Sequence, residues 1–314
     1  MKEFIIGADA GGTKTRACAY RADGEKPLRE AVTGPGNLAA DYPAASDEIT
    51  AAVRELLAAL PGKCAFLAVG AAGISASRDG VPVRELLKRD LCALHGLENT
   101  PMKLIPDAEL ALHANFAPSD NTASAIVISG TGSAAFAFAG DEILRTGGWG
   151  HLLGDGGSGY HVSLLFLRKL TAYADTDPVM LRRVLHLLED NGCTVFTGQD
   201  FRAAIVNLVY RQPKSDAASL APYVAALAET WMPAREILEE SAAALTEDVL
   251  HLFARIPAET KRLAYTGGFL THCTLFREIF LETLHRKLPD ITVTPSADPA
   301  SGVVRLYTRF QEEL

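Results

Sequence analysis

The sequence predicts an α/β protein with a mixed β-sheet that is duplicated in two domains. A glycine-containing hairpin pattern occurs twice, as FIIGADAGGTKTRACAY at residues 4–20 and as AIVISGTGSAAFAF at residues 125–138. Each copy is an apolar strand, a turn of glycine with threonine or serine, and a second strand, and in each half helices and strands follow. Because the copies lie about 120 residues apart, they indicate two half-molecules rather than a short tandem repeat.

The first half continues with strands and helices that its apolar pattern defines. The segment LREAVTGPGN predicts a third strand that ends in a turn. Apolar residues on one face predict a helix over residues 44–60, which Pro61 and Gly62 end. The continuous apolar run at residues 65–73 predicts a strand that is covered on both faces. A helix over 82–94, a strand over 102–105 and a helix that starts directly after Pro106 and Asp107 complete this half.

The segment APSDNT at residues 117–122 is the best candidate for a domain boundary, because it is polar and has no periodicity. We therefore expect a first domain over residues 1–117, closed by a C-terminal helix over 300–314, and a second domain over 118–299. In the second domain, apolar spacing predicts helices over 179–190, 199–210, 217–231, 234–256 and 275–288, with strands over 262–269 and in ITVTP.

Composition limits the classes of partner. A length of 314 residues suits two domains with a core each, and a hydrophobic content of 48% indicates that the whole chain is folded. The net charge of −8 argues against a nucleic-acid partner. No apolar run is long enough for a signal peptide or a membrane span, so we also expect no membrane partner.

The five cysteines are scattered along the chain and form no CxxC pair. This distribution predicts free thiols in a reducing compartment, rather than disulfides or a zinc site. We therefore expect a cytoplasmic protein.

The two glycine turns are candidates for phosphate binding. Glycine lets backbone N–H groups close around an anion, and the neighbouring hydroxyl groups add donors. The first turn is not a P-loop, because GxxxxGK[ST] is absent and a strand follows Lys14 where a P-loop would have a helix. A single turn of this kind would be interpreted as an ordinary hairpin. Two such turns, one in each half, favour two sites for the ends of a polyphosphate.

Two carboxylates accompany these patterns. Asp9 precedes the first turn, where it could hold a hydrated Mg²⁺ or bond its own backbone, and a nearby phosphate favours the metal. Asp107 lies where a buried strand meets a helix. It could be an N-cap or a general base for a substrate hydroxyl, and the two roles are compatible.

The run GGWGHLLGDGGSG at residues 147–159 is unusually rich in glycine. It contains a formal GxGxxG, but no clean strand precedes it, so we reject a dinucleotide site. The run could instead be a backbone cradle for a polar ligand, with an apolar face from Trp149 and an acceptor in Asp155, or it could be a plain turn. Gly267 and Gly268 by themselves indicate a strand-end turn, and Asn37 indicates a turn residue.

In order along the chain, ADAGGTKT, GPGN, IPDAELALHA, ISGTGS, GGWGHLLGDGGSGY and AYTGGF resemble the N-acetylglucosamine kinases of the BadF/BadG/BcrA/BcrD ATPase family, in the actin–hexokinase–Hsp70 superfamily. The resemblance spans nearly the whole chain. It implies two RNase H-like domains around a central ATP cleft, with Mg²⁺ and a small-molecule sugar as ligands. The implied reaction is ATP-dependent phosphorylation of a sugar hydroxyl, expected to be the 6-OH of N-acetylglucosamine or a related amino sugar.

The resemblance also assigns roles to residues of this sequence. Asp107 matches the catalytic base. Two further groups of residues match binding positions. The implied ATP-binding residues are Gly11, Gly12, Thr13, Lys14, Gly130, Thr131, Gly132, Gly267 and Gly268. The implied sugar-binding residues are Asn37, Asp107, Gly148, Trp149, Gly150 and Asp155.

Two departures from the family pattern concern the sugar more than the phosphoryl transfer. Gly156 stands where the family commonly has Glu, and the closing segment SADPASGVVRLYTRF lacks the usual GA pair. Two other functions stay open: an ATPase that couples hydrolysis to a partner protein, and a non-catalytic sugar-sensing protein. Long apolar helices in the second half are compatible with a homodimer.

Overall fold

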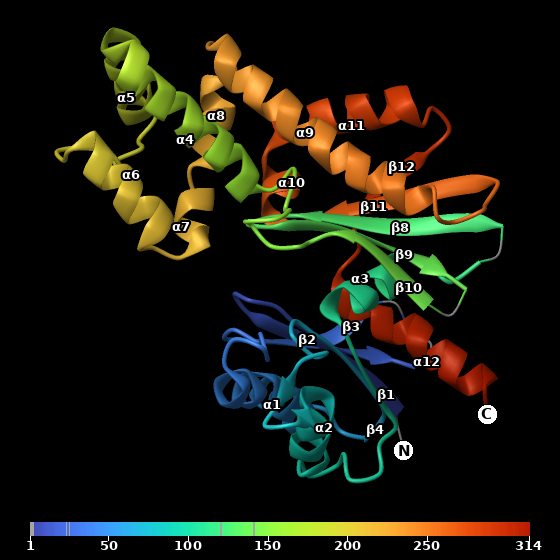
Figure 1. The fold of residues 1–314 in the computed structure, drawn as a ribbon. Coiled ribbons are helices and arrows are strands. Elements are labelled where there is room, and N and C mark those ends of the chain that lie inside the picture. Colours follow the sequence, from blue (N-terminus) through green and yellow to red (C-terminus); the bar gives the residue numbers. More distant parts are fainter. Residues whose placement is uncertain (1–2, 23, 25, 120, 141) are drawn as a thin grey trace. The chain divides into compact units, whose positions relative to one another are not determined.

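A computed structural model describes residues 3–22, 24, 26–119, 121–140 and 142–314 of the chain. The chain forms two compact units (Figure 1). Unit 1 comprises residues 1–118 and 296–314, and unit 2 comprises residues 119–295. The last segment of the chain therefore belongs to the same unit as the first.

Each unit contains a five-stranded mixed sheet, and the two sheets have the same topology. The order is β3-β2-β1-β4-β7 in unit 1 and β10-β9-β8-β11-β12 in unit 2. In both sheets the first three strands are antiparallel and the last two pair in parallel. The prediction of an α/β fold with a duplicated mixed sheet is confirmed. The strands are β1 (Glu3–Ala10), β2 (Thr15–Arg21), β3 (Pro27–Thr33), β4 (Lys63–Ala71), β7 (Met102–Ile105), β8 (Thr122–Ser129), β9 (Ser133–Ala139), β10 (Glu142–Gly147), β11 (Thr260–Thr266) and β12 (Thr292–Pro295), and a small hairpin consists of β5 (Ser77–Arg78) and β6 (Val81–Pro82).

Helices cover both faces of the unit 1 sheet. Since side chains alternate between the two faces of a strand, β1 contributes to a core on each face. Phe4, Ile6 and Ala8 of β1 pack in one core with α1 (Tyr42–Ala59) and α2 (Val83–Cys92). Ile5 packs in a second core with α3 (Asp107–Asn115) and the C-terminal elements η1 (Pro299–Ser301) and α12 (Gly302–Glu312). A Cβ atom at Gly7 would overlap the Ala300 carbonyl oxygen, so β1 needs glycine there.

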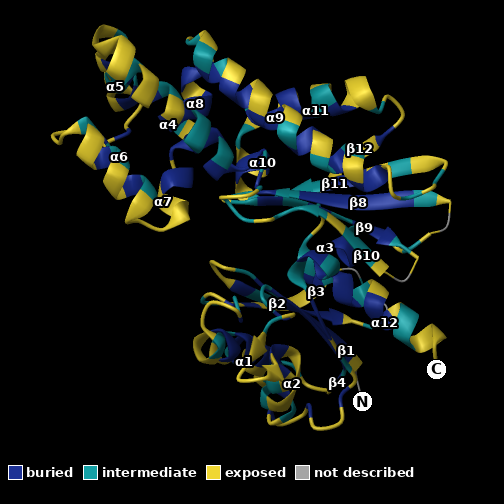
Figure 2. Cartoon of the chain, viewed as in Figure 1, coloured by how far each residue is buried: buried dark blue, intermediate teal, exposed yellow. Residues whose placement is uncertain are grey.

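Unit 2 has a single large core on one face of its sheet. Ala125 and Val127 of β8 contribute to it, together with Phe166, Leu245 and Phe276 of three covering helices. In Figure 2 β8 is dark blue, whereas the outer sides of α5 and α6 are yellow. The helices are α4 (Gly159–Thr176), α5 (Pro178–Asp190), α6 (Phe201–Tyr210), α7 (Lys214–Ala218), α8 (Ala221–Leu227), α9 (Met232–Phe253), α10 (Gly268–His272) and α11 (Thr274–Lys287).

Two predicted elements of unit 2 differ from the structure, one in its continuity and one in where it ends. The helix predicted over 217–231 is two short helices, α7 and α8, and Pro222 lies in the first turn of the second. A proline removes a backbone donor from a helix interior, so it is tolerated where a new helix begins. The strand predicted over 262–269 ends at Thr266, because Gly267 has a φ of 98° and is the N-cap of α10.

All five cysteines are free thiols, as the sequence predicted. Among the described residues, no helix combines the length and the apolar content that a membrane crossing requires.

Candidate functional site

The first glycine turn joins β1 to β2 in unit 1. The backbone N–H of Gly11 donates to the Lys14 carbonyl at 3.0 Å and closes the turn. Gly12, Thr13 and Lys14 are exposed, and a Cβ atom at Gly12 would meet no described atom within 4 Å. The turn therefore offers backbone donors and a lysine next to open space, which suits an anion.

The GPGN segment supports this turn. The N–H of Gly36 donates to the Gly11 carbonyl at 2.8 Å, and a Cβ atom at Gly36 would lie 2.6 Å from the Ala10 Cβ. Asn37 follows at once, and its Oδ1 accepts a hydrogen bond from the Ala39 N–H at 3.1 Å. Asn37 is thus a turn residue, as expected by default, and lies close to the end of the first hairpin.

Asp9 and Asp107 lie near one another in unit 1. Asp9 is near the end of β1, and its pKa is raised to about 7, first by burial and then by the charges of Asp107 and Asp298. Like charges close together in a poorly solvated place disfavour ionisation, and a bound cation would relieve that repulsion. The negative charges of Asp9, Asp107 and Asp298 are therefore suited to a metal cation.

Among the described residues there is no group of three or more His, Cys, Asp or Glu side chains that could hold a metal ion. Mg²⁺ keeps several of its waters and needs only one or two carboxylates from the protein. The role of Asp9 toward a hydrated Mg²⁺ stays a prediction.

Asp107 is the first residue of α3, and the N-cap is Pro106. The N-cap interpretation of Asp107 is therefore wrong by one position, because Pro106 is extended and takes the place before the first helical turn. The Asp107 Oδ1 accepts from the Ala108 N–H at 2.9 Å, which places the carboxylate beside the positive end of the helix. Burial raises the pKa of Asp107 above its usual value, which is the direction that a general base requires.

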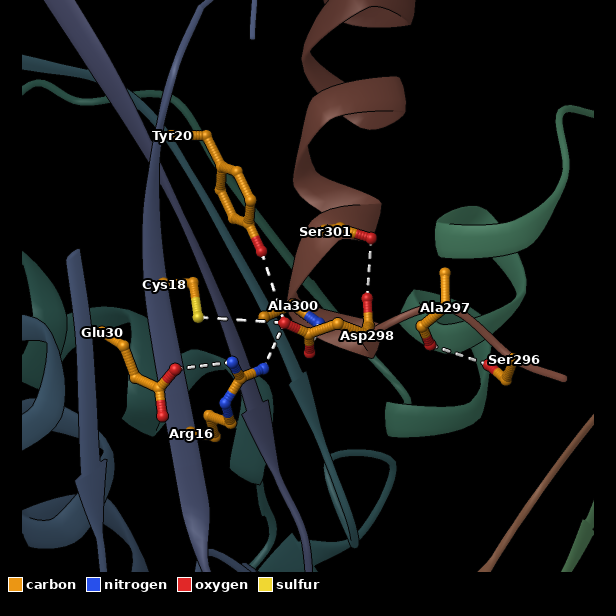
Figure 3. A network of polar contacts seen from close by, with 9 residues as sticks. All are labelled: Arg16, Cys18, Tyr20, Glu30, Ser296, Ala297, Asp298, Ala300 and Ser301. Carbon is orange, nitrogen blue, oxygen red and sulfur yellow. Dashed lines mark hydrogen bonds and ion pairs between the residues drawn. The ribbon is translucent and has the colours of Figure 1, made fainter. Parts of the chain in front are cut away.

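Asp298, which the sequence did not indicate, links the C-terminal segment to Arg16 of β2 (Figure 3). Its Oδ2 accepts from the Arg16 guanidinium, and the Tyr20 hydroxyl lies 3.5 Å away. Arg16 also pairs with Glu30 at 2.6 Å. Arg16 and Asp298 are 282 positions apart in the chain, so no local pattern could reveal the pair.

The second glycine turn joins β8 to β9 in unit 2. The Gly130 N–H donates to the Gly132 carbonyl at 2.9 Å, and the Gly159 N–H at the start of α4 donates to the Gly130 carbonyl at 2.8 Å. Thr131, at the tip of the turn, is exposed. The turn therefore rests against the N-terminus of a long helix, whose dipole favours an anion.

Gly267 and Gly268 lie beside this turn. Because β8 and β11 pair in parallel, their carboxyl ends meet at one edge of the sheet. A Cβ atom at Gly267 would overlap the Ser129 carbonyl, and one at Gly130 would lie 3.6 Å from the Gly268 nitrogen. A Cβ atom at Gly268 would meet no described atom within 4 Å. Gly267 is thus needed for packing, whereas Gly268 leaves open space.

The loop 147–159 holds Asp155 against the second turn. Asp155 has a φ of 58° and is only 4% exposed. Its Oδ2 has no hydrogen-bond partner among the described residues, and a Cβ atom at Gly132 would lie 2.8 Å from it. A buried acceptor without a donor is costly, so a donor group from a bound ligand would stabilise this oxygen.

The first part of the same loop presents an aromatic ring to solvent. Gly147, Gly148 and Gly150 have positive φ values, and Trp149 is 75% exposed. The Arg145 guanidinium lies 5.9 Å from the centre of the Trp149 ring. A Cβ atom at Gly154 would lie 3.1 Å from the Trp149 Cβ, so Trp149 lies beside Gly154, which directly precedes Asp155. In unit 2 the structure thus brings together the second turn, the 267–268 glycines, Asp155 and Trp149.

Comparisons with known proteins agree with this arrangement. The profile of the BadF/BadG/BcrA/BcrD ATPase family matches residues 6–304. An N-acetylmuramic acid/N-acetylglucosamine kinase from Clostridium acetobutylicum is 25% identical, over 96% of this chain and 97% of the relative. An N-acetyl-D-glucosamine kinase from Dictyostelium discoideum is 24% identical, over 97% of this chain and 98% of the relative.

Solved structures share the fold. A structure from Chromobacterium violaceum, named as a candidate N-acetylglucosamine kinase, superposes with a TM-score of 0.68 at 23% identity, and covers 97% of this chain and 98% of its own. A ROK family glucokinase from Streptomyces griseus, in complex with glucose and AMPPNP, has a TM-score of 0.57 at 17% identity, with 98% of each chain covered. Since the family profile spans most of the sequence, the chain belongs to the BadF/BadG/BcrA/BcrD ATPase family.

Proposed function

We propose that this protein transfers the γ-phosphoryl group of ATP to a hydroxyl of an amino sugar, with the 6-OH of N-acetylglucosamine as the expected acceptor. The observation that carries the proposal is the pairing of Asp9 and Asp107 in a poorly solvated place near an open glycine turn. The names of the two curated relatives support the substrate class.

The phosphates of ATP are proposed to contact Gly11, Gly12, Thr13 and Lys14 of unit 1 and Gly130, Thr131 and Gly132 of unit 2, with the adenosine at Gly267 and Gly268. Backbone N–H groups and a lysine suit the charge that spreads over the phosphate oxygens during transfer. Magnesium, held through Asp9, would neutralise part of the phosphate charge.

Asp107 is proposed as the general base. Its carboxylate accepts the proton of the sugar hydroxyl, the oxygen forms a bond to the γ-phosphorus, and the bond to the ADP oxygen breaks. A raised pKa makes the carboxylate a stronger base than an exposed aspartate. The sugar itself is proposed to contact Asn37, Gly148, Trp149, Gly150 and Asp155, because Asp155 has a buried acceptor and Trp149 an exposed ring.

Asp107→Asn tests this assignment. Asn keeps an oxygen that can accept from the Ala108 N–H, so the helix should still form. We expect kcat for sugar phosphorylation to fall by roughly 10²–10⁴-fold, because general base catalysis contributes about that much. The affinity for ATP should stay within a factor of about 2. Phosphorylation at the wild-type rate would restrict Asp107 to a role at the helix terminus.

An ATP-turnover assay over a panel of amino sugars separates the proposal from its alternatives. Sugar-stimulated release of ADP supports a kinase, whereas sugar-independent release would favour an ATPase that serves a partner protein. Sugar binding without turnover would favour a sensor. A homodimer and a cytoplasmic location stay predictions, which size-exclusion chromatography and localisation of a tagged protein can test.

A further inference from the structure

We propose that Lys214 is a positioning residue for Asp155, and that it supplies the counter-charge of the sugar-binding carboxylate without occupying its acceptor oxygen. The inference rests on the proposed function. The Lys214 Nζ lies 3.6 Å from the Asp155 Oδ2, and this carboxylate is buried.

The buried Asp155 carboxylate needs a cation beside it. Asp155 has a φ of 58°, a backbone conformation that residues other than glycine rarely adopt. The loop therefore fixes the position of the Asp155 backbone. A second acid, Asp248, lies close enough to interact with Asp155: burial raises the Asp248 pKa, His251 lowers it, and the charge of Asp155 raises it further. A buried carboxylate beside a second acid is strongly disfavoured unless a cation compensates it.

The distance between the Lys214 Nζ and the Asp155 Oδ2 determines how the two groups interact. At 3.6 Å the two groups attract each other as an ion pair, but they are too far apart for a good hydrogen bond. The Asp155 Oδ2 is accordingly without a hydrogen-bond partner in the described part of the chain. The charge of the carboxylate is therefore compensated, while its Oδ2 still lacks a hydrogen-bond donor, which a sugar hydroxyl would supply.

The backbone position of Lys214 is fixed by α7. It is the first residue of α7, directly after Pro213. Ala217 and Ala218 of the same helix are buried in the unit 2 core, and a Cβ atom at Gly159 would lie 3.4 Å from the Ala218 carbonyl. The helix is thus anchored against the start of α4, while the Lys214 side chain remains 44% exposed and can adjust to a ligand.

A double-mutant cycle tests the inference, with Lys214→Met, Lys214→Arg, Asp155→Asn and the Lys214→Met/Asp155→Asn variant. We expect Lys214→Met to raise KM for N-acetylglucosamine roughly 10-fold, with KM for ATP and kcat changed by less than about 3-fold. Lys214→Arg should restore most of the loss. In the Asp155→Asn background, Lys214→Met should have no further effect, because the charge that it serves is gone.

Arg202→Met is a matched control. Arg202 pairs with Asp175 at 3.8 Å, but both side chains are largely exposed, and an exposed pair contributes little. The variant should leave KM for the sugar unchanged. The inference is overturned if Lys214→Met behaves like Arg202→Met, or if it raises KM equally in both backgrounds.

The unfolding of the same variants separates this inference from the proposed function. If the wild-type protein phosphorylates no sugar, the proposed function fails. The cycle measured by thermal unfolding then still decides whether residues 155 and 214 are coupled: no coupling overturns the pairing, and coupling supports it.

Discussion

Gly267 and Gly268 are adjacent in sequence, yet the structure predicts opposite effects when each is changed to alanine. At Gly267 a Cβ atom would overlap the Ser129 carbonyl, and the φ of 98° is unfavourable for any side chain. The strained conformation alone costs about 1–3 kcal/mol, and the overlap with rigid backbone adds to it. At Gly268 a Cβ atom would meet no described atom within 4 Å.

The magnitude for Gly268→Ala follows from its place as the first residue of α10. Alanine is a better helix former than glycine and reduces the entropy of the unfolded chain, which is worth about 0.4–1 kcal/mol at a compatible site. The melting temperature of Gly268→Ala should therefore equal that of the wild-type protein or exceed it, with a rise of about 2–4 °C for each kcal/mol of added stability. Gly267→Ala should lower the melting temperature by several times the rise expected for Gly268→Ala.

The same pair reports on nucleotide binding. If the adenosine lies against Gly268, a methyl group there should weaken ADP binding by roughly 10-fold or more, although the protein is as stable as wild type. Differential scanning fluorimetry gives the stability, and isothermal titration calorimetry gives the affinity. Equal destabilisation by the two variants would refute the packing argument, and unchanged ADP affinity in Gly268→Ala would refute the adenosine contact.

Two further predictions concern buried titratable groups of unit 1. Asp9→Asn should raise the Mg²⁺ concentration for half-maximal activity roughly 10-fold or more, and should not lower the melting temperature, because it removes repulsion by Asp107 and Asp298; an unchanged Mg²⁺ requirement would exclude Asp9 as the metal residue. His113 has its pKa lowered from 6.5 to about 4, by burial first and then by Arg309. The unfolded chain therefore binds the extra proton below pH 6.5, so stability is lost as the pH falls from about 6.5 to about 4, by about 3 kcal/mol in total. Urea unfolding at several pH values should show a smaller loss in His113→Gln, and the exposed control His95→Gln should match wild type.

Local patterns of the sequence predicted most of the fold. The strand over 102–105 appears with those bounds, and the two hairpins have their glycine turns where the sequence placed them. Such elements depend on periodicity and turn chemistry within a few residues. The helix over 217–231 was wrong, because the apolar spacing continues across Pro222 although the backbone hydrogen bonds do not.

The candidate site was predictable only in part. Glycine turns and strand-end carboxylates leave a signal in the chain, and so Asp9, Asp107 and Asp155 could be named. The roles of Asp298 and Lys214 depend on partners distant in sequence, Arg16 and Asp155, and neither belongs to a motif. A long-range charge pair is set by tertiary structure, so a single sequence does not reveal it.

The return of the last residues to the N-terminal sheet has a consequence for biosynthesis. Ile5, Tyr20 and Phe66 pack against Val303 and Tyr307 of α12. During translation this apolar face stays uncovered until α12 leaves the ribosome, whereas the strands of unit 2 precede α12 in the sequence. Unit 2 can therefore mature first on the growing polypeptide, and unit 1 is completed only when residues 296–314 have been made.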